Sequence, residues 1–170
     1  MDIFLASDHA GFELKAKLYK YLKDQGHNVI DYGPHELDDA DDYPDLIAPL
    51  AHEISQNPAS RAIILGGSGQ GEAMVANRFP NVRAVVYNGE TRPRDGRQVP
   101  SELILSREHN DANVLSLGAR FLNEEETKEA VELWLHAKFS GEERHVRRLK
   151  KIEELSPCSS KADNDVTYTI

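Results

Sequence analysis

The chain of 170 residues contains a single cysteine, Cys158, and this scarcity excludes two kinds of structure. A disulfide framework and a cysteine-ligated zinc site both need several cysteines, so neither can form within one chain. Cys158 lies in a polar stretch near the C-terminus, and we interpret it as an exposed, incidental thiol.

Basic charge and long apolar runs are also scarce. The formal net charge is −9, which argues against a general nucleic-acid binder, because such proteins usually present a basic face. No apolar run approaches the roughly 20 residues that a membrane-spanning helix needs. The first residues read as a strand and lack the basic segment of a signal peptide. We therefore expect a cytoplasmic protein without nucleic-acid or membrane partners.

What the sequence does contain is a regular alternation of strand and helix patterns. Buried-strand runs cover residues 1–7, 28–32, 61–65, 83–87 and 113–117, and helical spacing covers 12–25, 44–56, 72–79, 101–107, 123–139 and 142–155. Parallel strands need crossover connections, so this order predicts an α/β fold: a doubly wound, three-layer α/β/α sandwich around a five-stranded parallel sheet, in a Rossmann-like arrangement. We expect residues 1–155 to form one domain that ends in a basic helix, and 156–170 to be a disordered tail.

Local signals support the helix positions. Asn123 is a suitable N-cap for a helix with an acidic first turn. The spacing of Ala130, Leu133, Trp134 and Ala137 predicts that these four side chains face inward.

Ligands of such sheets bind at the carboxyl ends of the strands. The first candidate there is the segment Gly66–Gly71, which contains four glycines and one serine, Ser68. Its free N–H groups and the following helix N-terminus can cradle an anion. It is neither a Walker loop, since no Gly-Lys-Ser/Thr follows, nor a good dinucleotide fingerprint. The alternative is a tight turn without a ligand.

Glu72 follows this loop directly. A carboxylate beside a bound sugar can remove a proton α to a carbonyl. On spacing alone, however, a first-turn glutamate that merely complements the helix dipole is the favoured interpretation.

Histidines and arginines supply the remaining candidates. His9, His109 and His145 lie in informative contexts, but no His-x-x-x-His pair or cysteine partner accompanies them, so we predict no metal. Arg144 and Arg148 are four residues apart and share a helix face, which suits a phosphate dianion. The alternative is a solvated, basic helix end.

Taken together, these motifs resemble type B ribose-5-phosphate isomerases and the related galactose-6-phosphate isomerase subunits. The resemblance covers residues 1 to about 152, and its motifs are specific as a set although each is weak alone. The matching segments are Ser7–Lys15, Asp42–Asp45, Gly67–Gly71, Ala76–Asn77, Arg107–Asn113, Leu117–Arg120 and Arg144–Arg148.

The resemblance implies an aldose–ketose isomerase that needs no cofactor. By position, Glu72 is implied as the base that moves a proton between C2 and C1 through a cis-enediolate, and His109 as the group that opens the furanose ring. Ser68 and the loop amides would stabilise the enediolate. The implied substrate-binding residues are Asp8, His9, Tyr43, Gly67, Gly69, Gly71, Asn110, Arg120, Arg144 and Arg148. Arg144 and Arg148 would hold the phosphate, helped by Arg120 and His9. The family also implies a homodimer, or a pair of dimers, with active sites shared between subunits.

Two departures from the family pattern leave alternatives open. Many members carry a catalytic cysteine where this chain has Gly66, whereas a subgroup uses a glutamate at the position of Glu72. The segment Asn88–Pro100 makes this chain roughly ten residues longer than the usual pattern, and long loops are often functional. Its arginines, Arg92, Arg94 and Arg97, could reach substrate, or the loop could extend the dimer surface. The first expectation is ribose 5-phosphate isomerisation, and the alternatives are a six-carbon or modified sugar phosphate, or a sugar-phosphate-binding protein without catalysis.

Overall fold

The computed structural model of the chain describes residues 2–91, 93–96 and 98–155, so the expected tail at 156–170 lies outside the described residues. The described residues form one five-stranded, wholly parallel sheet with the strand order β2-β1-β3-β5-β4. The strands are β1 (Asp2–Ser7), β2 (Asn28–Asp31), β3 (Arg61–Gly66), β4 (Ala84–Tyr87) and β5 (Val114–Gly118). The predicted parallel five-stranded sheet is confirmed.

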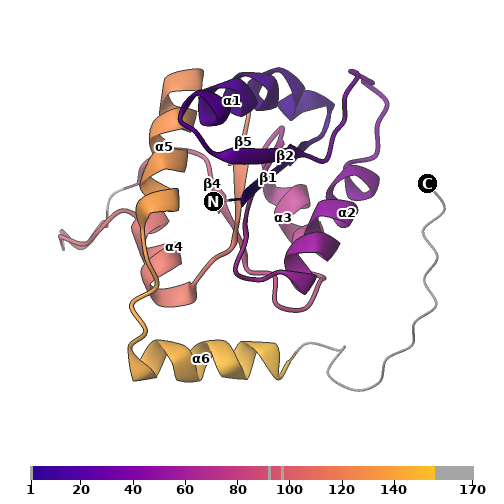
Figure 1. The fold of residues 1–170 in the computed structure, drawn as a ribbon. Helices are drawn as coiled ribbons and strands as arrows, with labels where there is room; N and C mark the ends of the chain where they lie inside the picture. The colour runs from indigo at the N-terminus through magenta and orange to yellow at the C-terminus, as the bar shows by residue number, and fades with distance from the viewer. Residues whose placement is uncertain (1, 92, 97, 156–170) are drawn as a thin grey trace.

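Helices cover both faces of the sheet and complete the three predicted layers (Figure 1). They are α1 (Phe12–Asp24), α2 (Tyr43–Gln56), α3 (Gln70–Ala76), α4 (Glu102–Asn110), α5 (Glu124–His136) and α6 (Glu143–Glu153), with a short 3-10 turn, η1 (His9–Gly11). Helices α1, α4 and α5 pack on one face, and α2 and α3 pack on the other. Helix α6 lies apart from both layers, below the sheet in Figure 1.

The alternation of apolar side chains along each strand builds the two cores. In β1, Ile3 and Leu5 belong to the core under α1 and α5, whereas Phe4 belongs to the core under α2. In β3, Leu65 belongs to the core under α1 and α5, and Ile64 belongs to the core under α2. Successive side chains of a strand point to opposite faces, so a continuous apolar run is what a strand covered on both faces requires.

Several details of the helices differ from the predictions, among them the bounds of α3 (Gln70–Ala76, predicted as 72–79) and the end of α5 (His136, predicted near 139). Helix α4 runs to Asn110 because Asp111 adopts a left-handed conformation (φ 44°) and its N–H bonds to the Arg107 carbonyl, which closes the last turn. In α5 the prediction for Leu133 is wrong, because its side chain is 40% exposed. The buried stripe instead contains Thr127, Ala130, Val131, Trp134 and Leu135, which leaves Leu133 beside the face that meets the sheet.

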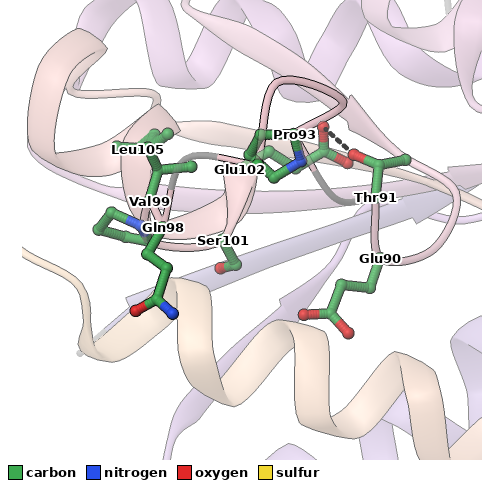
Figure 2. A pocket seen from close by; sticks show the side chains of 10 residues that line it. Glu90, Thr91, Pro93, Gln98, Val99, Ser101, Glu102 and Leu105 are labelled. Atoms are coloured by element: carbon green, nitrogen blue, oxygen red, sulfur yellow. Dashed lines mark hydrogen bonds between the residues drawn. The ribbon is translucent and has the colours of Figure 1, made fainter.

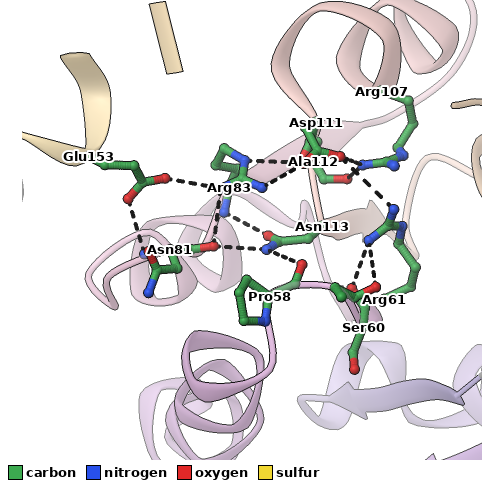
Figure 3. A network of polar contacts seen from close by, with 11 residues as sticks. Pro58, Ser60, Arg61, Asn81, Arg83, Arg107, Asp111, Ala112, Asn113 and Glu153 are labelled. Atoms are coloured by element: carbon green, nitrogen blue, oxygen red, sulfur yellow. Dashed lines mark hydrogen bonds and ion pairs between the residues drawn. The ribbon is translucent and has the colours of Figure 1, made fainter. Parts of the chain in front are cut away.

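A polar network closes the amino-terminal edge of the sheet and attaches α6 to it (Figure 3). Asp111 accepts hydrogen bonds from Arg83 Nη2 at 3.0 Å and from Arg107 Nη1 at 2.8 Å, and Arg61 Nη2 lies 4.0 Å away. Arg83 Nη1 also binds Glu153 Oε1 at 3.0 Å, at the end of α6. One carboxylate therefore neutralises several partly buried arginines where three strands begin.

The substitution Asp111→Asn tests this network, because asparagine tolerates the left-handed backbone, removes the charge and leaves one oxygen to accept from the arginines. We expect it to lower the free energy of unfolding by about 2 kcal/mol, between the values for exposed and buried ion pairs. Urea denaturation measures the loss. Asp24→Asn, at an exposed position on α1, is the control, and equal effects of the two substitutions would contradict the assigned role of Asp111.

Candidate active site

The first part of the site lies where β1 and β3 end side by side. The sheet order runs outward from this pair in opposite directions, which makes it the topological switch point where α/β folds bind ligands. Asp8 follows β1, its N–H donates to the Leu65 carbonyl, and its Oδ1 accepts from Gly11 N at 2.9 Å. These bonds hold η1, which begins at His9, against the end of β3.

The glycine loop connects β3 to α3 and directs backbone amides into this region. Gly69 is the N-cap of α3 and has a φ of 72°, a conformation that favours glycine. No described residue accepts a hydrogen bond from the backbone N–H of Ser68, Gly69 or Gly71. Free amides at the start of a helix have the arrangement that the predicted anion cradle requires.

Glu72 turns its side chain back over the end of β3. A Cβ placed on Gly66 would overlap with the Glu72 carboxylate, so the carboxylate occupies the space where a side chain at position 66 would begin. Glu72 is only 4% exposed. Burial raises the pKa of its carboxyl group, and the charges of Asp8 and Asp41 and a hydrogen bond with Asp8 add to the rise. Glu72 is thus a buried carboxylate that faces the candidate site, and complementing the helix dipole does not account for its position.

Two more of the predicted side chains lie against the loop glycines. A Cβ on Gly71 would come within 2.8 Å of the Tyr43 ring, and a Cβ on Gly67 within 3.0 Å of the Arg120 guanidinium carbon. These glycines leave room for larger groups from α2 and from the turn after β5. Nine of the predicted residues therefore lie at the carboxyl ends of the strands. They are Asp8, His9, Tyr43, Gly67, Ser68, Gly69, Gly71, Glu72 and Arg120.

Asp41 is a residue of this site that the sequence analysis missed. Its Oδ1 lies 2.7 Å from His9 Nδ1, and its side chain is only 8% exposed. This hydrogen bond raises the pKa of His9, and the charges of Asp8, Asp41 and Asp39 raise it further, while partial desolvation opposes them. Several aspartates follow one another in this loop, and a contact between residues 32 positions apart leaves no local signal.

The other predicted residues lie at the opposite edge of the sheet. His109 and Asn110 end α4 next to Asp111, which contacts arginines at the starts of β3 and β4. Arg144 and Arg148 lie on α6, and both are exposed. A strand rises about 3.3 Å per residue, so the length of β5 alone separates the two groups by roughly 15 Å. Within one chain, His109, Asn110, Arg144 and Arg148 do not join the Glu72 group.

His145 supports His109 in this second group. The two rings lie 4.3 Å apart between centroids, and His145 is buried with its Nδ1 2.9 Å from Ser140 Oγ. His145 therefore packs as a structural neighbour of His109. Within the described part of the chain, no cluster of three His, Cys, Asp or Glu side chains could hold a metal ion.

The long loop after β4 lies against the start of α4. Its described residues and α4 line a groove of about 670 Å³, and Thr91 Oγ1 donates to Glu102 Oε2 at 3.4 Å (Figure 2). Arg94 is exposed, and Arg92 and Arg97 lie outside the described residues. A role for these arginines at the substrate stays a prediction.

Comparison with known proteins now identifies the family. The family model described as Ribose/Galactose Isomerase matches residues 3–152. The chain belongs to the ribose/galactose isomerase family. It is 42% identical over 151 residues to the probable ribose-5-phosphate isomerase B of Mycoplasma pneumoniae, covering 88% of this chain and 91% of that protein. It is 35% identical over 155 residues to the ribose-5-phosphate isomerase B of Mycobacterium tuberculosis, covering 91% and 89%.

Solved structures of the isomerase family share the fold. The Mycoplasma genitalium ribose-5-phosphate isomerase B with bound ribulose-5-phosphate has a TM-score of 0.80 and 36% identity, over 90% of this chain and 94% of that chain. The Clostridium thermocellum ribose-5-phosphate isomerase B also has a TM-score of 0.80 and 36% identity, over 91% and 96%. These likenesses confirm the resemblance and the fold predicted from the sequence.

Replacing Asp41 by asparagine tests its contact with His9. Asp41→Asn keeps an oxygen near Nδ1 but removes the charge, so we expect the pKa of His9 to fall toward its ordinary value. A titration of the His9 ring followed by NMR measures this change. Asp39→Asn, which removes only a more distant charge, should lower the pKa less, and unchanged titration in Asp41→Asn would show that the contact is not formed.

Proposed function

We propose that this chain interconverts ribose 5-phosphate and ribulose 5-phosphate by proton transfer between C2 and C1. The observation that carries the proposal is the Glu72 carboxylate, buried over Gly66 beside a loop of free backbone amides. The relatives' names support the substrate, since they are ribose-5-phosphate isomerases B and one of them holds ribulose-5-phosphate.

In the proposed mechanism Glu72 is the base. Its carboxylate takes the proton from C2 of the open-chain aldose, which gives a cis-enediolate, and the protonated carboxyl returns the proton to C1, while the hydroxyl proton on O2 passes to O1 to give the ketose. Burial favours this task because it makes the carboxylate a stronger base. The amides of Gly69 and Gly71 and the Ser68 hydroxyl would stabilise the enediolate oxygen as negative charge develops on it.

The remaining predicted residues bind the sugar and open its ring. In the proposal Asp8, His9 and Tyr43 contact the sugar beside Glu72, and Arg120 helps to bind the phosphate; Tyr43 lies next to Gly71 and Arg120 next to Gly67. In the proposal His109 moves the proton that opens the furanose, Asn110 contacts the sugar, and Arg144 and Arg148 bind the phosphate. Such remote binding positions the reacting carbons at the base.

His109, Asn110, Arg144 and Arg148 lie at the end of the sheet opposite Glu72, so the proposed roles of these four residues call for a second subunit. We propose a homodimer in which each site combines the Glu72 group of one subunit with the His109 and arginine group of the other. The free edge of β4 offers a surface for this contact: all four of its residues are only half-buried, and Met74 beside it is 67% exposed. His109 and Asn110 line a groove of about 300 Å³ along the same edge.

The proposed substrate is a phosphorylated sugar of central metabolism, so the proposal places the enzyme in the cytoplasm. Among residues 2–91, 93–96 and 98–155, no helix has both the length and the apolar character needed to cross a membrane.

Glu72→Gln keeps the shape of the side chain and removes the base. We expect kcat to fall about 1,000-fold with a small change in KM, a loss typical of removing a general base. The wild-type rate should also fall on acidification at a pH above the ordinary range of a glutamate carboxyl, because burial raises the pKa of Glu72 and only its deprotonated form accepts a proton. Steady-state kinetics across pH measure both effects.

Exchange of solvent deuterium into the sugar is the companion measurement. Wild-type protein should exchange the C2 proton of ribose 5-phosphate, whereas a protein that only binds the sugar would leave it in place. Turnover of Glu72→Gln near the wild-type rate would overturn the assignment of the base.

Mixing two inactive variants tests the shared site. Glu72→Gln removes the base, and His109→Ala removes the ring-opening group that the other subunit contributes. In a mixed dimer, one site therefore has both residues intact and the other has neither. After random exchange of subunits we expect about a quarter of the wild-type activity, since half of the dimers are mixed and each has one intact site. Activity that stays at the level of the separate variants would mean that each site belongs to a single chain.

A further inference from the structure

Two side chains donate hydrogen bonds to consecutive carbonyl groups of the glycine loop. Asn88, the first residue after β4, donates from Nδ2 to the Ser68 carbonyl at 3.1 Å. Ser116, inside β5, donates from Oγ to the Gly69 carbonyl at 2.6 Å. The loop that follows β3 is therefore fixed by residues from the two strands that lie beyond β3 in the sheet.

These bonds set the direction of the amides that the mechanism uses. In a trans peptide the carbonyl and the N–H of one unit point in opposite directions. The Ser68 carbonyl shares its unit with the Gly69 N–H, so anchoring the carbonyl at Asn88 turns that N–H away from β4. No described residue accepts a hydrogen bond from it. A donor that is fixed in advance stabilises a developing charge better than one that must reorient.

The packing around Asn88 leaves its amide little freedom. A Cβ on Gly118 would overlap with Asn88 Oδ1, so the amide is wedged between the end of β5 and the glycine loop. Asn88 Oδ1 is buried and has no hydrogen-bond partner among the described residues. An unsatisfied buried oxygen is unfavourable for the fold. The Asn88 side chain therefore donates to Ser68 in an orientation that lowers the stability of the protein.

The hydrogen bond from Ser116 fixes the glycine loop independently of Asn88. Its side chain is completely buried. A Cβ on Gly69 would lie 2.9 Å from Ser116 Oγ, so this hydroxyl also favours glycine at the turn. The Gly69 carbonyl accepts a second bond from Ala73 N at 3.2 Å. Losing Ser116 should therefore loosen the loop less than losing Asn88, which is the one side chain that donates to the Ser68 carbonyl among the described residues.

We infer that Asn88 is a positioning residue for the isomerisation, which holds the Ser68–Gly69 peptide so that its N–H faces the enediolate. This inference rests on the proposed function. It gives the first residue of the long loop after β4 a role at the reaction centre, although Asn88 need not touch the substrate.

The test uses Asn88→Asp in the full-length protein, because it preserves the side-chain shape and replaces the donor to Ser68 by an oxygen. We expect kcat for ribose 5-phosphate to fall about 10- to 100-fold, less than or equal to the loss from deleting an oxyanion donor, with KM within about twofold. Ser116→Ala is the second variant, for which we expect a smaller fall in kcat.

Two inhibitors separate positioning from general damage. A four-carbon phosphohydroxamate copies the charge of the enediolate, whereas ribitol 5-phosphate copies only the sugar. In Asn88→Asp the inhibition constant of the hydroxamate should rise by about the same factor as kcat falls, while that of ribitol 5-phosphate stays the same, because only the first ligand needs the oriented amide.

Asn77→Asp is the matched control. Asn77 Nδ2 donates to the Ala84 carbonyl at 3.0 Å, so this variant also loses an amide bond to the backbone next to β4, away from the glycine loop. It should keep the wild-type kcat. Unchanged kcat in Asn88→Asp, or equal weakening of both inhibitors, would overturn the inference while leaving the proposed function intact. A wild-type protein that neither isomerises ribose 5-phosphate nor exchanges its C2 proton would instead overturn the proposed function, and this inference with it.

Discussion

The site depends on one steric constraint: at the end of β3 the backbone carries no side chain of its own, and the Glu72 carboxylate occupies the space above Gly66. The same pattern recurs along the loop, where the Arg120 guanidinium lies over Gly67 and the Tyr43 ring lies over Gly71. Any side chain at these glycines would displace a functional group. The glycines therefore serve two purposes, since they free backbone amides for an anion and make room for side chains that come from other elements.

The charges around Glu72 agree with the proposed sharing of the site between two subunits. Asp8, Asp41 and Glu72 bring carboxylates together beside His9, and their mutual repulsion helps to raise the pKa of Glu72. That arrangement suits a base but repels a phosphate dianion. At this edge Arg120 and His9 are the residues expected to help bind the phosphate, whereas Arg144 and Arg148 lie on α6 beyond the opposite edge of the sheet. In the proposed dimer Arg144 and Arg148 would supply cations for the phosphate to the site of the other subunit.

Much of the fold could be predicted because its signals are local. The paired apolar faces of β1 and β3 and the capping box at Asn123 follow from neighbouring residues alone. Glu72 is harder, because its spacing fits a dipole-complementing residue equally well and only the resemblance, and then the geometry over Gly66, favours a base. Asp41 and Asn88 could not be found, since each acts through a contact 20 or more positions away. Neither periodicity nor composition encodes such contacts.

The carboxylates at the two ends of the strands have opposite surroundings. Where the strands begin, Asp111 is paired with arginines, which secures the sheet and α6. Where the strands end, Glu72 is buried near Asp8 and Asp41, whose charges raise its pKa further. Unpaired buried atoms do not separate the two ends, because among the described residues they include Ser7 Oγ, Asp41 Oδ2 and Asn88 Oδ1 but also Arg107 Nε, Glu132 Oε1 and Trp134 Nε1. The difference therefore lies in charge: a buried carboxylate beside other carboxylates is unfavourable for the fold, and it suits a group that must accept a proton.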